Sequence, residues 1–202
     1  MSAGCAILAP VIIFLRACVF AGLSLAAVSC ASGPRAGGDA APLAITPATL
    51  YPLQVGYAWS YDVDSGDGQP VLATARVLRA DAQTADVQSG QGVQHFTITP
   101  EGISRAGQAG FFLLRAPLTA DSRWASGPEA EAQLVALGQQ VTTPAGVFEG
   151  CVVIREQHTT GQDVSTTYCP GVGPVRIESR MQVRGQRVAV IATLRGYSAQ
   201  AP

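Results

Sequence analysis

The sequence contains no lysine, and its charged residues are few and nearly balanced. All 13 basic residues are arginines, and they stand against 14 acidic residues, which gives a formal net charge of −1. Proteins that bind nucleic acids usually present a clustered basic face and have a high isoelectric point. With a net charge so close to zero, the sequence predicts no nucleic-acid partner.

Histidine and the common catalytic motifs are equally scarce. His95 and His158 lie in strand-like patterns, and neither has a cysteine or histidine partner at metal-ligand spacing. A nucleophilic pair of Cys151 and His158 fails on distance, because a single strand separates them by about 23 Å. The chain has no Gly-x-Ser-x-Gly elbow, and "PGVG" (170–173) lacks the spacing of a phosphate-binding loop. We therefore expect no catalytic, cofactor-binding or metal-binding residues.

Two charged clusters have ordinary structural explanations. "DVDSGDG" (62–68) holds the densest carboxylates, and alternating oxygen ligands next to glycine suit calcium. No acidic residue follows in 68–80 to close such a loop, so a hairpin turn rich in Asp and Gly explains the segment better. The most basic stretch consists of Arg176, Arg180, Arg184 and Arg187. Because Glu178 is interleaved, we interpret it as a solvated strand face, with membrane headgroups or a polyanion as the alternative.

The first 29 residues have a different character. Residues 6–29 are almost entirely apolar or small, and Arg16 is the only charge before Arg35. The run "ACVFAGLSLAA" (17–27) has the length of a secretory h-region. It ends at "AVSC" (27–30), which resembles the lipobox of bacterial lipoproteins. In that family the cysteine thiol is diacylglycerylated, signal peptidase II cuts before it, and the new amino terminus is acylated. An uncleaved anchor, or plain secretion with a chance cysteine, is the alternative.

This resemblance implies that residues 1–29 are a lipoprotein signal peptide and that Cys30 is lipidated. Two or more acyl chains anchor a protein stably, at about 0.8 kcal/mol for each buried methylene. Ala31 rather than aspartate follows the cysteine, which by resemblance to enterobacterial sorting implies the outer membrane, facing the periplasm. Residues 30–47 are rich in Gly, Ala and Pro, and we interpret them as a flexible tether spanning on the order of 20 Å. Residues 48–202 then form one β domain.

Strand patterns dominate that domain. In "YAWSYDVD" (57–64) aromatic and polar residues alternate, as in a half-buried strand. Similar patterns recur up to "VRIESRMQVR" (175–184), and the apolar run "FFLLRAPL" (111–118) is expected to be a buried strand. Residues 129–138 fit either a short helix or a strand starting near Gln133. The sequence predicts an all-β fold of roughly nine to eleven strands. This antiparallel meander would form a strongly curved sheet or an incompletely closed barrel, because an open sheet exposes its edges.

A disulfide between Cys151 and Cys169 is expected from the spacing of two neighbouring strands. If the signal peptide is removed and Cys30 is lipidated, these are the two thiols left in an oxidising compartment. The turn signal between them, "TTGQ" (159–162), lies at their midpoint, so a hairpin turning there places the cysteines opposite each other. Opposed residues have Cβ atoms about 4.5–5.5 Å apart, which is close to what a bridge needs. Two buried thiols are the alternative, and a one-residue shift in pairing would forbid the bond.

Four motifs together resemble a largely uncharacterised group of bacterial lipoproteins. They are "YPLQVGYAWSY" (51–61), "LRAPLTADSRW" (114–124), "TTPAGVFEGC" (142–151) and "TTYCPGVGPVRIES" (166–179). The resemblance covers about residues 50–197 and implies no particular activity. Within it, "PLQVGYAW" (52–59) and "PLTADSRW" (117–124) share Pro-Leu and a later Trp, which is weak evidence for an internal duplication.

These observations lead to a hypothesis of a lipid-anchored, non-enzymatic β domain in the bacterial cell envelope. It would serve as a binding or assembly accessory, with the membrane reached through Cys30 and with an apolar ligand or an envelope protein as partner. A ligand would need a cavity of several hundred Å³ inside the curved sheet, roughly 300–1,000 Å³. The alternative is an envelope hydrolase with an unrecognised active site.

Overall fold

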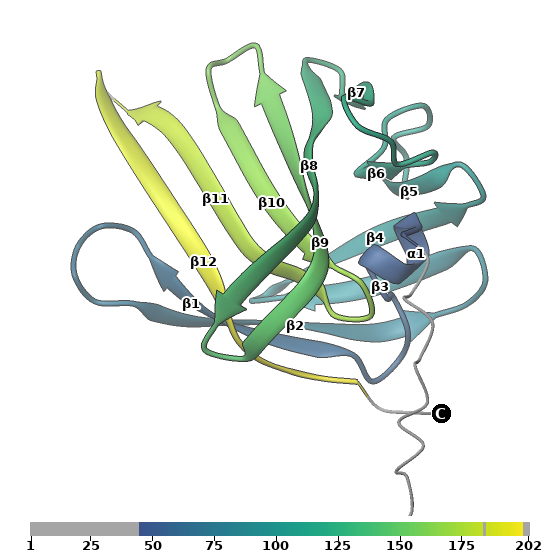
Figure 1. Cartoon of the computed structure of the whole chain (residues 1–202), viewed down its shortest axis with the longest axis horizontal. Coiled ribbons are helices and arrows are strands. Elements are labelled where there is room, and N and C mark those ends of the chain that lie inside the picture. The colour runs from purple at the N-terminus through teal and green to yellow at the C-terminus, as the bar shows by residue number, and fades with distance from the viewer. Residues whose placement is uncertain (1–44, 184, 200–202) are drawn as a thin grey trace, which may run out of the picture. The chain divides into compact units, whose positions relative to one another are not determined.

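The computed structural model describes residues 45–183 and 185–199, and Cys30, the signal peptide, most of the tether and Arg184 lie outside them. The described chain is almost entirely β-structure and folds as one antiparallel sheet of 12 strands. The all-β prediction is confirmed, with more strands than expected. The sheet curves into a nearly closed barrel (Figure 1).

The strands fall into two meanders of six. In each meander, strands that follow one another in sequence are paired side by side. The first comprises β1 (Ala58–Asp64), β2 (Val71–Ala80), β3 (Thr84–Ser89), β4 (Gly92–Thr99), β5 (Gly102–Arg105) and β6 (Leu114–Arg115). The second comprises β7 (Arg123–Gly127), β8 (Ala130–Thr143), β9 (Gly146–His158), β10 (Asp163–Cys169), β11 (Gly173–Val183) and β12 (Gln186–Ser198).

The two meanders are joined head to tail. β1 pairs with β12 along its whole length, which leaves β6 and β7 as the two edges of the sheet. These edges form the single seam of the barrel. Across it, the Phe112 amide donates to the Ala125 carbonyl at 3.0 Å, and the Trp124 indole donates to the Phe112 carbonyl at 2.8 Å. The seam is therefore bridged by a few hydrogen bonds but not by a regular ladder.

The weak sequence repeat corresponds to this topology. Trp59 is the second residue of β1, Trp124 is the second residue of β7, and both are buried. Each indole also donates to a backbone carbonyl, of Val172 and Phe112 respectively. The two Pro-Leu…Trp segments thus open the two six-stranded halves at equivalent positions.

One open alternative is resolved and one expectation needs correction. Of the two alternatives for residues 129–138, the structure has the strand: β8 begins at Ala130, before the expected start near Gln133, and pairs with β9 with shifts in register. The run 111–118 is not one buried strand, since only Leu114 and Arg115 are in strand conformation. The Phe112 amide bonds across the seam to Ala125 instead of joining the ladder with β5. Pro117 has no amide hydrogen, so it cannot extend that ladder.

One end of the barrel is filled by the N-terminal segment and by a hairpin tip. The single turn α1 (Pro47–Leu50), capped by Thr46, lies inside the curve of the sheet (Figure 1), and Leu50 is fully buried. The β8–β9 hairpin tip curls over β12, where the Ala145 amide donates to the Leu194 carbonyl at 3.3 Å. The Phe148 and Tyr197 rings also pack, with centroids 6.0 Å apart. The "PAGVF" motif thus contacts β12 through Ala145 and Phe148.

Candidate functional site

The interior of the barrel has a packed aromatic floor, built from residues of the first and last motifs. The Trp59 indole donates to the Val172 carbonyl at 2.6 Å, and the Tyr61 hydroxyl donates to the Pro174 carbonyl at 2.9 Å. The Tyr51 ring packs against Trp59, Phe96 and Tyr168, with centroid distances of 5.7, 5.7 and 6.2 Å. These motif residues therefore join segments more than 100 positions apart, a structural role.

Gly173 shows why the "PGVG" loop needs its glycine. Its φ is +105°, and a Cβ added there would lie 3.0 Å from the Trp59 indole nitrogen. A larger residue would meet both backbone strain and a clash with the buried indole. The backbone carbonyls of this loop accept the hydrogen bonds of Trp59 and Tyr61. We call it the acceptor loop.

The disulfide between Cys151 and Cys169 is present, so this prediction is confirmed. Asp163 faces Gln157 and Tyr168 faces Val152 in the β9–β10 ladder, which makes the cysteines the next opposed pair. Their Cα atoms are 4.1 Å apart and both residues are buried. Because Cys169 directly precedes Pro170, the bond fixes β9 to the start of the acceptor loop. It also leaves no Cys151 thiol for His158.

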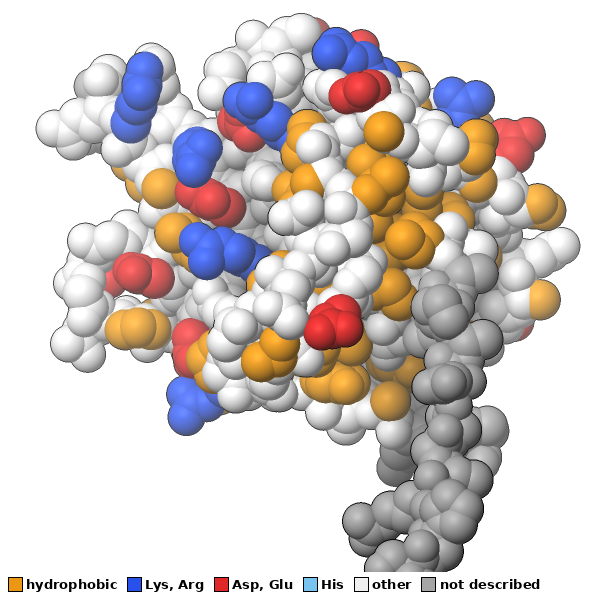
Figure 2. Space-filling view, viewed as in Figure 1, with side chains coloured by type: hydrophobic (Ala, Val, Ile, Leu, Met, Phe, Trp, Pro, Cys, Tyr) orange, Lys and Arg blue, Asp and Glu red, His pale blue; other side chains and the backbone are white. Residues whose placement is uncertain are grey.

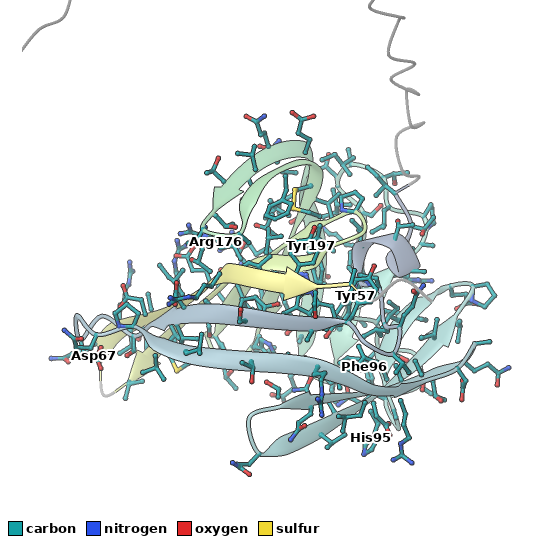
Figure 3. The ribbon with its side chains drawn as sticks, turned by 90° about the horizontal axis from the view of Figure 1, so that it is seen from below. Tyr57, Asp67, His95, Phe96, Arg176 and Tyr197 are labelled. Atoms are coloured by element: carbon teal, nitrogen blue, oxygen red, sulfur yellow. A yellow bond between two sulfur atoms is a disulfide. The ribbon has the colours of Figure 1, made fainter. Side chains whose placement is uncertain are left out.

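Above the aromatic floor lies a cavity of about 190 Å³. It is bounded by residues of β4 and β5 and by Leu113 on one side and by residues of β9–β11 on the other. Its lining residues are Tyr51, Gln94, Phe96, Arg105, Leu113, Ile154, Glu156, Val164, Thr166, Tyr168, Pro174 and Ile177. In Figure 3, Phe96 points to the inside of the sheet and its neighbour His95 to the outside. The cavity is smaller than a typical small-molecule site of about 300–1,000 Å³.

The cavity combines neutral phenols with one unpaired cation. Burial raises the pKa of Tyr51 to about 12, and Arg105 partly opposes this shift. Burial also raises the pKa of Tyr168, so both phenols stay protonated at neutral pH. Glu156 lies 2.8 Å from the His158 ring nitrogen. Within the described part of the chain, Arg105 has no carboxylate within ion-pair distance, and it is the one cation of a lining whose one carboxylate is Glu156.

Beyond the cavity the inner face of the sheet continues as an apolar wall. The register places Val71, Val63, Ala192 and Ile177 in one row across β2, β1, β12 and β11. We define the apolar wall as this row together with Val188, Val190 and Met181. Val71 is 65% exposed and the other members are half-buried. Figure 2 shows hydrophobic side chains gathered right of centre, over the region where Figure 1 places β7 and α1, whereas at the left charged side chains lie among the hydrophobic ones.

The remaining candidates from the sequence lie outside the barrel interior. Asp64 and Asp67 accept backbone amides of their own turn, from Gly66 at 2.7 Å and Gln69 at 3.3 Å. Asp62 pairs with Arg195 at 3.0 Å. Each carboxylate is thus engaged as the turn interpretation requires. In the described ranges we find no group of three or more His, Cys, Asp and Glu side chains that could hold a metal.

Arg180 of β11 and Arg187 of β12 line a hollow together with Arg155 and Asp163, and Met181 and Val188 of the apolar wall also border it. Arg180 pairs with Glu178 at 2.6 Å and Arg155 with Asp163. In Figure 3, Arg176 lies at the outside of its strand. These pairings support the interpretation as a solvated face.

His95 is the nearest approach to a catalytic arrangement. Its Nδ1 lies 2.6 Å from the Asp86 carboxylate, which also binds Arg79. The hydrogen bond from His95 holds the pKa of Asp86 below its usual value. The hydroxyl in the adjoining hollow, on Thr84, donates instead to Asp81 at 2.8 Å. An oriented imidazole is therefore present without a hydroxyl directed at it.

The sequence analysis did not single out Arg105 or Tyr168. Phe96 and Arg105 are paired across β4 and β5. In the sequence, Arg105 is marked only as a charged residue at the end of a short strand pattern, which does not indicate a binding site. Their meeting with Tyr168 depends on closure of the sheet.

No helix in the described residues has the length and apolar character required to cross a membrane.

No protein-family model matches the chain, and no curated protein matches it. Two solved structures are similar in fold. One, from Bacteroides fragilis, is described as an exported protein with a YmcC-like fold; it has 14% identity and a TM-score of 0.46 over 75% of this chain and 99% of its own. The other, from Parabacteroides distasonis, is described as a lipoprotein; it has 12% identity and a TM-score of 0.38 over 74% of this chain and 98% of its own.

Proposed function

We propose that this chain is a lipid-anchored protein of the bacterial cell envelope whose β domain is a non-enzymatic binding accessory. The anchor is the acylated Cys30, which holds the domain at the outer membrane, facing the periplasm. The observation that supports a binding role is the apolar wall. This inward-facing surface continues from the cavity through Ile177, and its members are half-buried except for the exposed Val71. Exposed contiguous apolar surfaces of soluble domains commonly mark interaction sites.

The floor of the barrel favours binding over chemistry. The Trp59 indole and the Tyr61 hydroxyl donate their hydrogen bonds to backbone carbonyls, and these bonds stabilise the fold. A nucleophilic mechanism needs a nucleophile, a base and an orienting group within hydrogen-bond reach. The Asp86–His95 pair supplies two of these on the outer face, and the nearby Thr84 hydroxyl is bound to Asp81.

The anchor is tested by Cys30→Ser. We expect this variant to remain an uncleaved precursor or to lose its lipid, because a hydroxyl does not replace the thiol that receives the diacylglyceryl group. Metabolic labelling with a radioactive fatty acid, followed by immunoprecipitation, measures the result. Cys18→Ser, which changes a cysteine within the signal segment, is the matched control and should keep its label. Equal labelling of the Cys30 variant and the wild type would show that the protein is not a lipoprotein of this type.

The binding role is tested by placing a photo-crosslinking amino acid at Met181 or at its neighbour Gln182. The two residues are consecutive on β11 and face opposite sides of the sheet. If the inner face is the binding surface, irradiation of intact cells gives a specific adduct from position 181 and little or none from position 182. Adducts of equal yield from both positions, or none from position 181, would contradict the proposal.

A further inference from the structure

The geometry points to one class of occupant: we propose that the cavity and the apolar wall bind a long-chain fatty acid, with its carboxylate at Arg105 and its acyl chain along the wall. This inference rests on the proposed function and deepens it, since a binding accessory could instead receive a protein segment. Three features carry it: the donors that converge on the cavity, its limited volume, and its continuity with the wall.

The cavity supplies what a carboxylate needs. Arg105, an exposed side chain at the rim, is the one cation of the lining, and none of the described ion pairs includes it. The lining also holds one carboxylate, Glu156, which contacts His158 at 2.8 Å. Tyr51 and Tyr168 line the same space, and burial keeps both phenols protonated, so that they remain hydrogen-bond donors. Arg105, Tyr51 and Tyr168 thus line one cavity together. Hydrogen bonds from charged donors to carboxylates are about twice as strong as neutral ones.

The volume limits how much of a ligand can enter. A closed apolar cavity of about 150 Å³ holds a molecule the size of benzene, so a cavity of about 190 Å³ accommodates a headgroup with only the first carbons of a chain. The rest of a long ligand must lie outside it. A helical segment of a partner protein has a diameter of about 10–12 Å including side chains. Such a segment is too wide to enter this cavity.

The wall begins where the cavity ends. Ile177 belongs to both, and from Ile177 to Val183 strand β11 runs about 20 Å at about 3.3 Å per residue, with Met181, the exposed Val183 and the half-buried Ser179 on the same face. An acyl chain in a bilayer occupies about half of a hydrocarbon core that is roughly 30 Å thick, so the wall is long enough for one chain. Every strand of the wall is hydrogen-bonded on both sides, and it therefore offers no free backbone edge to an added β-strand.

The experiment uses full-length protein in native membranes and two photoreactive probes of equal chain length, a diazirine palmitate and a diazirine hexadecanol. We expect palmitate adducts that map by mass spectrometry to β11 and β12. Labelling at equal concentration should be at least about tenfold stronger for palmitate than for the alcohol, because the alcohol lacks the charge-assisted bonds to Arg105. Arg105→Gln should abolish this preference and leave the weaker labelling of the wall.

Arg115→Gln is the matched control. Arg115 lies over the Phe112 ring, 5.6 Å from its centroid, and is not part of the cavity lining; this variant should keep the palmitate preference. Circular dichroism verifies that both variants are folded. Absence of wall adducts, or equal labelling by the two probes in the wild type, would overturn the inference. If position 181 crosslinks to a protein and palmitate gives no adduct, the binding role stands and the fatty-acid ligand does not.

Discussion

Trp59→Ala is expected to lower the free energy of unfolding by about 3–5 kcal/mol, the range for removal of a buried tryptophan. Trp59 is 2% exposed, packs against Tyr51 and Tyr57, and donates to the Val172 carbonyl. The substitution therefore opens a cavity in the floor and leaves a buried acceptor without its donor. A single domain is typically stable by about 5–15 kcal/mol, so this loss is a large fraction of the total. Urea denaturation followed by circular dichroism measures it.

Trp59→Phe separates the hydrogen bond from the packing. It keeps an aromatic ring and removes the indole donor, and we expect a loss of about 1–3 kcal/mol from the unsatisfied carbonyl. Trp124→Phe is the matched control, because the buried Trp124 indole also donates to a backbone carbonyl, but to that of Phe112, which is only half-buried. It should cost less than Trp59→Phe. Equal stability of Trp59→Ala and the wild type would show that the aromatic floor is not where the fold is held together.

Removal of the disulfide by Cys151→Ala with Cys169→Ala is expected to cost about 3 kcal/mol, from the chain-entropy estimate for a loop of this length. The sequence separation is 18 residues. Because the bond fixes the start of the acceptor loop, some of the loss should appear as weakened packing of Trp59, which its fluorescence reports. Urea denaturation of the double variant, compared with wild type under non-reducing conditions, gives the magnitude.

Wild type in the presence of a reductant is the control, and it should unfold at nearly the same urea concentration as the double variant. The single variant Cys151→Ala should lose as much stability as the double variant, since either change breaks the same bond. Unchanged stability of the double variant contradicts this prediction. So does the alkylation of two thiols when the mature protein is unfolded without reductant.

Local features of this fold were readable from the sequence. The alternation in residues 57–64 correctly placed Trp59 and Tyr61 on the buried face, because a strand directs successive side chains to opposite sides. The turn at 159–162 correctly set the register of β9 and β10, and with it the disulfide. Both depend on contacts between residues that are near each other in sequence, so that a pattern and a turn signal are enough to define them.

One local expectation failed and one pattern left two alternatives open, and in both cases a tertiary contact decided the conformation. The run 111–118 has the composition of a buried strand, yet Phe112 turns aside to bridge the seam with Ala125. Residues 129–138 suited a helix as well as a strand, and the long ladder with β9 decided the matter. The composition of a segment does not determine which other segment of the chain it will pack against or pair with.

The sequence by itself determined the β class, the alternating faces and the hairpin that carries Cys151 and Cys169. Only the tertiary structure decided that β1 pairs with β12 and that Trp59 reaches the loop at Val172, 113 positions away. The same closure brings Arg105 of the first meander to Tyr168 of the second, and so creates the cavity. The physical reason is that these contacts form only when the whole sheet curls, and no local pattern specifies how far it curls or which edges meet.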